Sequence, residues 1–295
     1  MEIKNISTFL KIVEFNNFTR AAESLGYSQA AVTAQIKALE SELGVPLFDR
    51  VGKRIYLTHQ GKAFLPYAKR ILNDEAEALE SVRPGGTLKG ELTICSASSY
   101  ASKILPGILL EFRRLHPEVV ITVKVSDFVD DNIQKLRQGE IDFLTCLDEP
   151  KTYEGLRVAT NAPVSTVFVT HPGNPLLKKK KHSISQVIES EFIASDREIG
   201  YCALLERELG RRGMELKPAM EIGSVDAIIR VIRGGYGTAL LPEYMVKDHL
   251  RTGELLSLDV TDLKIELTAP LLCSGDRWLS PVMKEYIRIV DSTSF

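Results

Sequence analysis

The opening of the chain carries apolar residues at helical spacing in successive short segments. The first, residues 5–13, is expected to form a helix with one apolar side. In the second, residues 21–25 place their apolar side inward, with Thr19 as the expected N-cap, and Gly26 stands where a left-handed residue ends a helix at low cost. Two helices alone bury too little surface, so we expect a third to complete a compact core.

The third segment has two clearly different sides. Ser28 is a suitable N-cap, and the apolar residues that follow are spaced four, three and four apart, which predicts one buried stripe. The stripe consists of Val32, Ile36, Leu39 and Leu43. The opposite side carries Ala30, Thr33, Ala34 and Lys37, with Gln29 at its exposed N-terminal end.

This outer side is small, polar and weakly cationic, which suits a helix that lies in the major groove of DNA. Small side chains let the backbone approach the base edges, Gln29 can pair with adenine, and Lys37 can meet guanine or phosphate. The alternative, which the helix alone leaves open, is that the small residues pack against other parts of the protein.

A predicted hairpin follows this helix and adds positive charge. Residues 50–58 alternate like two short strands, and Arg50, Lys53 and Arg54 lie near the tip, where cations would meet phosphates. Residues 1–72 contain ten Lys and Arg against six Asp and Glu, whereas the whole chain has a net charge of -2. The positive excess therefore coincides with the predicted groove-reading segment, which favours DNA as its partner.

The motif FTRAAESLGYSQAAVTAQIKALESELGVPLFDR, followed by LTHQG and LPYAKRIL, resembles the N-terminal module of LysR-type transcriptional regulators. Looser matches follow in order along the rest of the chain: GELTI, LPGILLEFRRLHPEV, GEID and GGYGTALLP. The resemblance therefore covers the whole chain. It implies a DNA-binding head, a linker helix that dimerises, and a ligand-sensing domain.

Two positions depart from the family pattern. The family often has proline where Ala30 stands and frequently a basic residue where Ala34 stands, so we expect fewer direct base contacts and a larger contribution from operator shape. The residues expected at the DNA interface are Thr19, Ser28, Gln29, Ala30, Thr33, Ala34, Lys37, Arg50, Lys53 and Arg54.

Residues 58–82 predict a long helix with apolar residues tending to one side, namely Phe64, Ala68, Ile71, Ala78, Leu79 and Val82. A lone helix cannot bury that side, whereas pairing with the same helix of a second subunit would. Pro66 removes a backbone donor and should bend the helix near Lys62. The RPGGT sequence that follows predicts a hinge.

From Gly90 onward, predicted strands and helices alternate, which indicates a mostly parallel sheet. The first unit has strands at 91–95, 119–125 and 141–146 and helices at 105–115 and 131–138. A second unit begins near Pro163, with strands at 166–170, 192–195, 220–222 and 239–241 and helices at 202–212 and 226–233. A last strand at 265–273 and helix at 281–290 return to the first unit, so two lobes share crossover strands and leave a cleft between them.

The expected fold class is α/β overall, with an N-terminal all-α winged helix-turn-helix, a long linker helix, and a two-lobed α/β effector domain of the periplasmic-binding-protein type. The expected boundaries are 1–58 for the DNA-binding domain, 59–83 for the linker helix, 84–89 for the hinge, 90–162 with 266–295 for effector subdomain I, and 163–265 for effector subdomain II.

Candidate ligand residues follow the predicted strand ends, because ligands of open α/β sheets bind beyond the carboxyl ends of the strands. These residues are Ser96, Ser98 and Ser99 from the first lobe and Ser195, Gly200 and Ser224 from the second. The family resemblance implies that small hydroxyl residues at the first of these turns contact an inducer. The alternative is that the serines only cap helices. A helix N-terminus favours anions, so a small organic anion is the expected effector.

The four cysteines lack CxxC spacing and three fall at predicted apolar strands, which favours buried thiols. Some members of the resembling family sense peroxide through two cysteines of the second lobe, which here holds only Cys202. A cysteine-based redox-responsive regulator is therefore the alternative reading. The five histidines are dispersed, so no metal site is expected, and no cofactor.

The chain also lacks a nucleophile elbow, a phosphate loop and a dinucleotide fingerprint, so we expect no enzyme. Its 295 residues are 44% hydrophobic, contain no run of membrane-spanning length and begin without a secretory signal, which predicts a cytoplasmic protein. The expected partners are double-stranded operator DNA, a small-molecule effector, further copies in a homodimer or homotetramer, and RNA polymerase. A cytoplasmic small-molecule-binding protein without a role at DNA is the weakest alternative.

Overall fold

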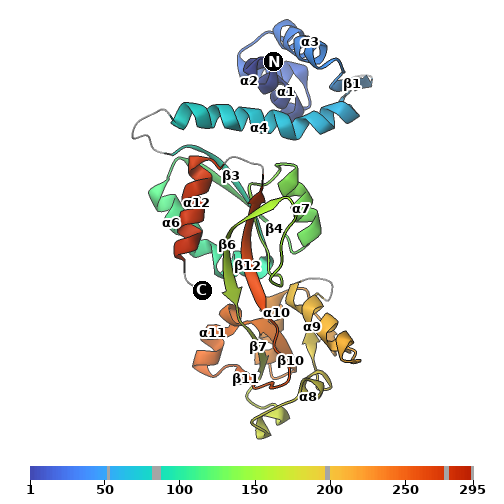
Figure 1. Cartoon of the computed structure of the whole chain (residues 1–295), viewed down its shortest axis with the longest axis vertical. Helices are drawn as coiled ribbons and strands as arrows, with labels where there is room; N and C mark the ends of the chain where they lie inside the picture. The colour runs from blue at the N-terminus through green and yellow to red at the C-terminus, as the bar shows by residue number, and fades with distance from the viewer. Residues whose placement is uncertain (52–53, 82–87, 197–199, 276–278, 294–295) are drawn as a thin grey trace. The chain divides into compact units, whose positions relative to one another are not determined.

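A computed structural model describes residues 1–51, 54–81, 88–196, 200–275 and 279–293. The chain divides into two compact units, an N-terminal unit that precedes residue 88 and a C-terminal unit that contains most of the chain from Leu88 on. No described helix is both long enough and apolar enough to cross a membrane. The N-terminal unit carries α1 to α4, and the C-terminal unit carries the larger sheets (Figure 1).

Three helices, α1 (Ile3–Phe15), α2 (Phe18–Leu25) and α3 (Gln29–Leu43), form the core of the N-terminal unit. The predicted stripe of α3 is buried at Val32, Ile36 and Leu39 and half-buried at Leu43. It packs with Ile6, Phe9, Ile12, Phe18, Ala21, Ala22, Leu47 and Ala68 in one apolar cluster. The trihelical core predicted from the sequence is therefore present.

The turns between these helices follow the expected chemistry at two of three places. Gly26 ends α2 with φ of 69°, in the left-handed region, and the Ser28 hydroxyl accepts a hydrogen bond from Ala31 N at 3.2 Å as the N-cap of α3. The expected cap of α2 was wrong. Asn17 precedes the helix in an extended conformation, and its Oδ1 accepts from Thr19 N and Arg20 N at 2.8 and 3.1 Å, so Thr19 lies inside the helix.

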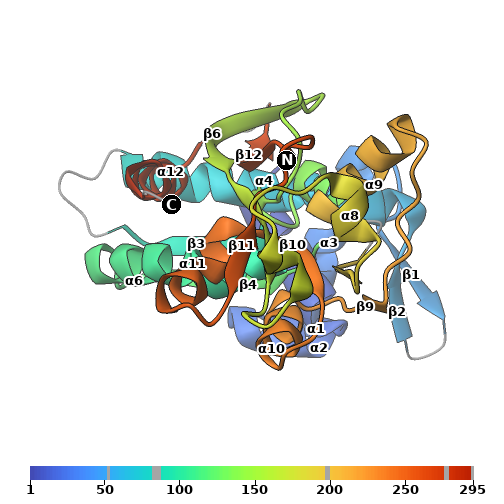
Figure 2. The same cartoon turned by 90° about the horizontal axis from the view of Figure 1, so that it is seen from below.

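A short antiparallel hairpin and a long helix complete the N-terminal unit. The hairpin pairs β1 (Phe48–Val51) with β2 (Arg54–Leu57), which Figure 2 shows side by side. The long helix is α4 (His59–Ser81), with Pro66 inside it. Its first turn lies so close to the head that a Cβ on Gly61 would stand 2.1 Å from the carbonyl oxygen of Leu47. Only glycine fits there, so the start of α4 is fixed to the head.

The first lobe of the C-terminal unit is a five-stranded sheet in the order β4-β3-β5-β12-β6. Its strands are β3 (Gly90–Ser96), β4 (Val119–Val125), β5 (Phe143–Thr145), β6 (Leu156–Val164) and β12 (Leu267–Ser274). The pairs β3-β4 and β3-β5 are parallel, and β12 runs antiparallel to β5 and β6. The sequence predicted a mostly parallel sheet. One half of the sheet is parallel, and the other half is antiparallel.

Helices cover both faces of this sheet (Figure 1). On one face α6 (Leu105–Leu115) and α12 (Pro281–Ser292) pack through Phe112 and Tyr286, whose ring centroids are 5.9 Å apart. On the other face α7 (Val129–Arg137) buries Leu136 against Cys95. A short helix, α5 (Ser98–Lys103), precedes α6 and was not predicted from the sequence.

The second lobe combines a three-stranded antiparallel sheet, in the order β10-β7-β11, with a parallel pair, β8-β9. Its strands are β7 (Thr166–Thr170), β8 (Ile193–Ala194), β9 (Met220–Glu221), β10 (Thr238–Pro242) and β11 (Leu256–Leu258). Its helices are η1 (Pro175–Lys178), α8 (Ile184–Ile188), α9 (Gly200–Arg211), α10 (Val225–Arg233) and α11 (Glu243–Thr252). The sequence analysis predicted none of η1, α8, α11 and β11 in this lobe, nor β6 in the first lobe.

Two neighbouring strands join the lobes. β6 and β12 pair from Leu156 and Ser274 to Val164 and Leu267, and β7 starts directly after β6. Beyond the paired strands, the Thr166 hydroxyl donates to Ile265 O at 3.4 Å, so the two connecting segments stay in contact as they enter the second lobe. Figure 1 shows both strands running from one lobe to the other.

Candidate functional sites

The outer face of α3 is open to solvent. Gln29, Ala30, Ala34 and Lys37 are exposed and Thr33 is half-exposed, because the buried stripe turns the opposite side of the helix away from the core. The alternative that these small residues pack inside the head does not hold. The face therefore has the access that a groove-reading helix needs, and its contacts with DNA remain a prediction.

One threonine contacts the side chain of Gln29 and another contacts its backbone. The Thr19 hydroxyl donates to Gln29 Oε1 at 3.2 Å, and the Thr33 hydroxyl donates to Gln29 O at 2.8 Å. Since Thr19 engages the carbonyl end of the side-chain amide, the NH₂ end is left to donate outward. Thr19, expected as a helix cap, thus holds Gln29 across the turn between α2 and α3.

The structure describes only part of the predicted cationic hairpin. Arg50 lies in β1 and Arg54 begins β2, opposite Val51, but their side chains are outside the description. Lys53 lies outside the described residues altogether. Phosphate contacts by this hairpin stay a prediction.

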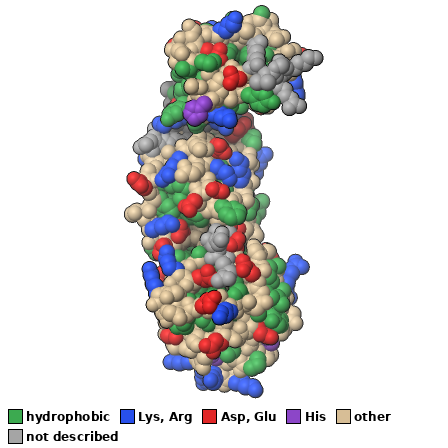
Figure 3. All heavy atoms as spheres, turned by 90° about the vertical axis from the view of Figure 1, so that its right-hand side faces the viewer, with side chains coloured by type: hydrophobic (Ala, Val, Ile, Leu, Met, Phe, Trp, Pro, Cys, Tyr) green, Lys and Arg blue, Asp and Glu red, His purple; other side chains and the backbone are tan. Residues whose placement is uncertain are grey.

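On the face shown in Figure 3, basic and acidic side chains are interspersed over the C-terminal unit.

A cavity of about 350 Å³ lies between the two lobes of the C-terminal unit. The first lobe contributes residues that follow β3, β4 and β5, and the second contributes residues around the start of α9 and α10. Its lining is Ala97, Ser98, Ser99, Val125, Ser126, Asp127, Phe128, Val129, Cys146, Leu147, Ser195, Asp196, Gly200, Tyr201, Gly223 and Val225. This is the size and position expected for a small-molecule site in an α/β protein.

Four of the six candidate ligand residues, Ser98, Ser99, Ser195 and Gly200, lie in this lining. Two do not. Ser96 is fully buried and its hydroxyl donates to Ala97 O at 3.3 Å, and Ser224 uses its hydroxyl to accept from Ala227 N at 3.4 Å as the N-cap of α10. Ser224 thus caps a helix, as the alternative expected, and its contact with a ligand stays a prediction.

Two hydrogen bonds at the cleft join segments that lie far apart in the sequence. The hydroxyls of Ser99 and Tyr244 are 2.8 Å apart and buried, and burial raises the pKa of Tyr244, which keeps the phenol neutral. Ser98 N donates to Asp127 Oδ1 at 2.9 Å. Neither Tyr244 nor Asp127 was predicted. Asp127 follows the strand end of β4, so the argument that selected the serines could have found it.

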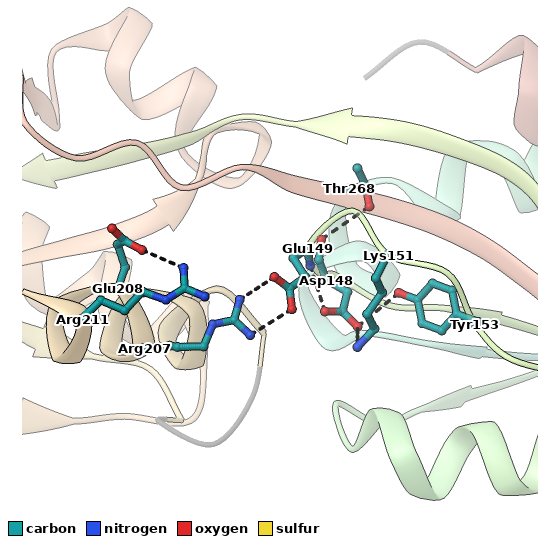
Figure 4. A network of polar contacts seen from close by, with 8 residues as sticks. All are labelled: Asp148, Glu149, Lys151, Tyr153, Arg207, Glu208, Arg211 and Thr268. Atoms are coloured by element: carbon teal, nitrogen blue, oxygen red, sulfur yellow. Dashed lines mark hydrogen bonds and ion pairs between the residues drawn. The ribbon is translucent and has the colours of Figure 1, made fainter.

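Ion pairs join the lobes beside the cleft. Glu149, from the segment after β5, binds Arg207 of α9 through both carboxylate oxygens, with Oε1 to Nη1 at 2.9 Å (Figure 4). On α5, Lys103 pairs with Asp248 of α11 at 3.0 Å. These residues are largely exposed, so each pair adds a modest free energy. Together with the Ser99 and Tyr244 pair they hold the lobes in the arrangement described here.

The four cysteines are free and buried. Burial raises the pKa of Cys146 to about 12, with Asp148 adding to the effect, and burial also raises the pKa of Cys95. Reactive cysteines need an accessible, stabilised thiolate, so the redox alternative finds no support at these two residues. Among the described residues, no cluster of three metal-binding side chains occurs.

Comparisons with known proteins agree with this architecture. Residues 3–62 match the model for the bacterial regulatory helix-turn-helix protein of the lysR family, and residues 85–293 match the LysR substrate binding domain. The HTH-type transcriptional regulator YwqM of Bacillus subtilis (strain 168) is 30% identical over 293 residues, which cover 99% of each chain.

Two solved structures are similar in fold. A full-length cysteine variant of OxyR from Pseudomonas aeruginosa gives a TM-score of 0.72 at 17% identity, covering 100% of this chain and 99% of that one. DarR from Vibrio fischeri in complex with DNA gives a TM-score of 0.56 at 22% identity, covering 100% of this chain and 99% of that one. With both of its domains matched by family models, the chain belongs to the LysR-type family: it is a DNA-binding transcriptional regulator with a ligand-responsive C-terminal domain.

Proposed function

We propose that this regulator recognises operator DNA with the outer face of α3 and alters its operator binding when a small molecule occupies the cleft between the lobes. The observation that carries the proposal is the exposed face of α3, on which Thr19 fixes Gln29 in a donor orientation. Asn17 and Ser28 cap the two helices around it, so the face is preformed. We assign no catalytic role to the outer face of α3.

In the major groove, the Gln29 amide would meet base edges, and Ala30 and Ala34 would let the helix backbone approach closely. Lys37 at the next turn and the cations of the hairpin would bind phosphates, which adds affinity without sequence information. The outward NH₂ group of Gln29 fits an acceptor such as adenine N7, guanine N7 or guanine O6. The adenine pairing that the sequence suggested therefore stays a prediction.

We propose that α4 carries the contact between subunits. Its inward residues Phe64, Ala68 and Ile71 pack on the head, whereas Tyr67 and Leu79 are 63% and 54% exposed. Exposed apolar residues on a helix of 23 residues support pairing with a second copy, as a dimer or as two dimers in a tetramer. Contact with RNA polymerase stays a prediction of the family resemblance.

Ligand control follows from the two-lobed construction. A molecule that contacts both lobes stabilises one interlobe angle over others, by as much as its affinities for the two arrangements differ. Because Ser98 and Ser99 come from the first lobe and Ser195 and Gly200 from the second, a bound molecule would bridge them. The ligand thereby selects the geometry of the subunit.

The decisive experiment compares operator and random DNA by fluorescence anisotropy. Gln29→Ala should reduce the ratio of the two affinities by about tenfold or more, since a good base contact contributes about 1–3 kcal/mol of discrimination. Lys11→Ala is the matched control: Lys11 lies on α1 of the same unit and pairs with Glu14, so the ratio should stay unchanged. An unchanged ratio in the Gln29 variant would exclude α3 as the reading surface.

A further inference from the structure

We infer that the cleft takes a small ligand that carries a protonated amine, and that Asp127 is the partner of this amine. The inference rests on the proposed function, because it names the class of molecule that occupies the proposed effector cleft. It replaces the organic anion expected from the sequence. The described lining contains carboxylates, hydroxyls and apolar groups but no Lys, Arg or His.

Asp127 occupies the position that an anion would use. Its Oδ1 accepts a hydrogen bond from Ser98 N, at the start of α5, at 2.9 Å. This backbone N–H is the donor for which the sequence predicted an anionic ligand, and the carboxylate of Asp127 already binds it. The helix is also short, with six residues. An incoming carboxylate would meet the charge of Asp127 at close range in a partly buried site, which is unfavourable.

The second oxygen of Asp127 is available to a ligand. Asp127 lines the cavity, and Oδ2 makes no hydrogen bond with any described residue. A carboxylate oxygen in a partly buried wall binds an ammonium group more strongly than a neutral donor. No basic side chain of the described lining competes for it, so we expect the ligand to supply the cation.

Tyr201 gives an independent indication of a bound polar molecule. The residue is only 6% exposed, it lines the cavity, and its hydroxyl makes no hydrogen bond with the described residues. Burial raises the pKa of Tyr201, and the side chain of Ser195 opposes this effect, so the Ser195 hydroxyl lies near the phenol but without the geometry of a hydrogen bond. A buried hydroxyl without a partner is costly. We expect the ligand to supply that partner.

The remaining walls define the body of the ligand. Phe128, Val129 and Leu147 are apolar, and about 350 Å³ is at the small end of the range for small-molecule sites. Ser99 and Tyr244 satisfy each other at 2.8 Å. The site therefore fits a compact apolar body with an amine at one end and a second polar group near Tyr201.

The test is a calorimetric titration of the full chain with probes matched in size and opposite in charge. Benzylamine is compared with benzoate, and butylamine with butyrate. We expect each amine to bind at least tenfold more tightly than its acid. Asp127→Asn keeps an oxygen for Ser98 N but removes the charge, and should weaken amine binding at least tenfold. Asp130→Asn, exposed in the first turn of α7, is the matched control and should change nothing.

Further variants examine the two ends of the site. Tyr201→Phe should weaken 3-hydroxybenzylamine several-fold more than benzylamine, because only the former offers the phenol a partner. Arg197 lies outside the described residues, next to Asp196 in the sequence, and Arg197→Ala tests it as an anion partner. Tighter binding of the acids, with loss of that binding in Arg197→Ala, overturns the inference. So does binding of neither probe class.

Operator binding, measured with the same probes, separates this inference from the proposed function. If an acid binds and changes operator affinity, the amine inference fails and the ligand-responsive function stands. If amines bind through Asp127 but leave operator affinity unchanged, the inference stands and the ligand response fails. Thermal unfolding of Asp127→Asn within about 2 °C of the parent chain would show that lost amine binding is not lost folding.

Discussion

The outer face of α3 and the interlobe cleft differ in how far apart in the sequence the residues that build them lie. On α3 the residues that we propose to contact DNA lie on one helix face, are exposed or half-exposed, and are oriented only by neighbouring groups such as Thr19. In the cleft, Ser99 pairs with Tyr244, which is 145 residues away. One surface is therefore a local product of helical periodicity, whereas the other exists only after the whole C-terminal unit has assembled.

The largest effect is expected from a charge placed inside the head. Val32 is fully buried beneath the reading face, so Val32→Asp should cost the N-terminal unit about 3 kcal/mol or more and abolish operator binding. Ligand binding should persist, because the cleft belongs to the other unit. Calorimetric unfolding together with probe titration checks both expectations.

The same substitution on the opposite side of α3 provides the control. Ala34 is exposed, so Ala34→Asp should change stability by less than about 0.5 kcal/mol while weakening operator binding through repulsion from phosphate. If Ala34→Asp unfolded the head as Val32→Asp does, the division of α3 into a core side and a reading side would be wrong.

A smaller effect is expected in the cleft. Ser99→Ala leaves the Tyr244 hydroxyl buried without its partner, which should destabilise the C-terminal unit by about 1 kcal/mol and reduce the ligand response. Operator affinity without ligand should stay unchanged. Tyr244→Phe should add little on top of Ser99→Ala, and Ser257→Ala, exposed on β11, is the control. Additive losses in the double variant would count against the hydrogen bond.

Acid should act more strongly on the C-terminal unit than on the head. Arg288 chiefly, and then His116, lower the pKa of Glu285 from 4.5 to about 2, despite the opposing effect of burial. Since the folded pKa lies below the unfolded one, the stabilisation is present above about pH 5 and is lost as pH falls from 4.5 to 2. Glu285→Gln should cost about 1 kcal/mol at pH 7 in urea unfolding, with the difference disappearing near pH 2. A pH-independent difference would refute this origin.

The smallest effect is expected for the ion pair beside the cleft. Glu149→Gln weakens an interlobe contact that is about 40% exposed, so stability should fall by no more than about 0.5 kcal/mol. Ligand affinity should change by less than about threefold, with the difference from the parent chain shrinking as salt is raised. Glu215→Gln, whose partner Lys217 lies two residues away, is the control. A loss that persists in high salt would show that the contact is not mainly electrostatic.

The sequence predicted the features that depend on nearby residues. The buried stripe of α3, its Ser28 cap and most strands of the first lobe follow from periodicity and capping chemistry. Thr19 was misassigned because capping depends on the backbone conformation, which is extended at Asn17. Tyr201 and Tyr244 were missed because no local sequence pattern predicts which helix of the second lobe faces the strand ends of the first lobe.

The paired connection between the lobes restricts the motion that a ligand produces. β6 and β12 are hydrogen bonded to one another up to Val164 and Leu267, and the Thr166 contact with Ile265 continues the link beyond them. Although the pairing is irregular between Leu271 and Leu272, we expect the two strands to bend together. A bound ligand would then rotate the lobes about a two-stranded ribbon, and the stiffness of the ribbon would set the angle of rotation.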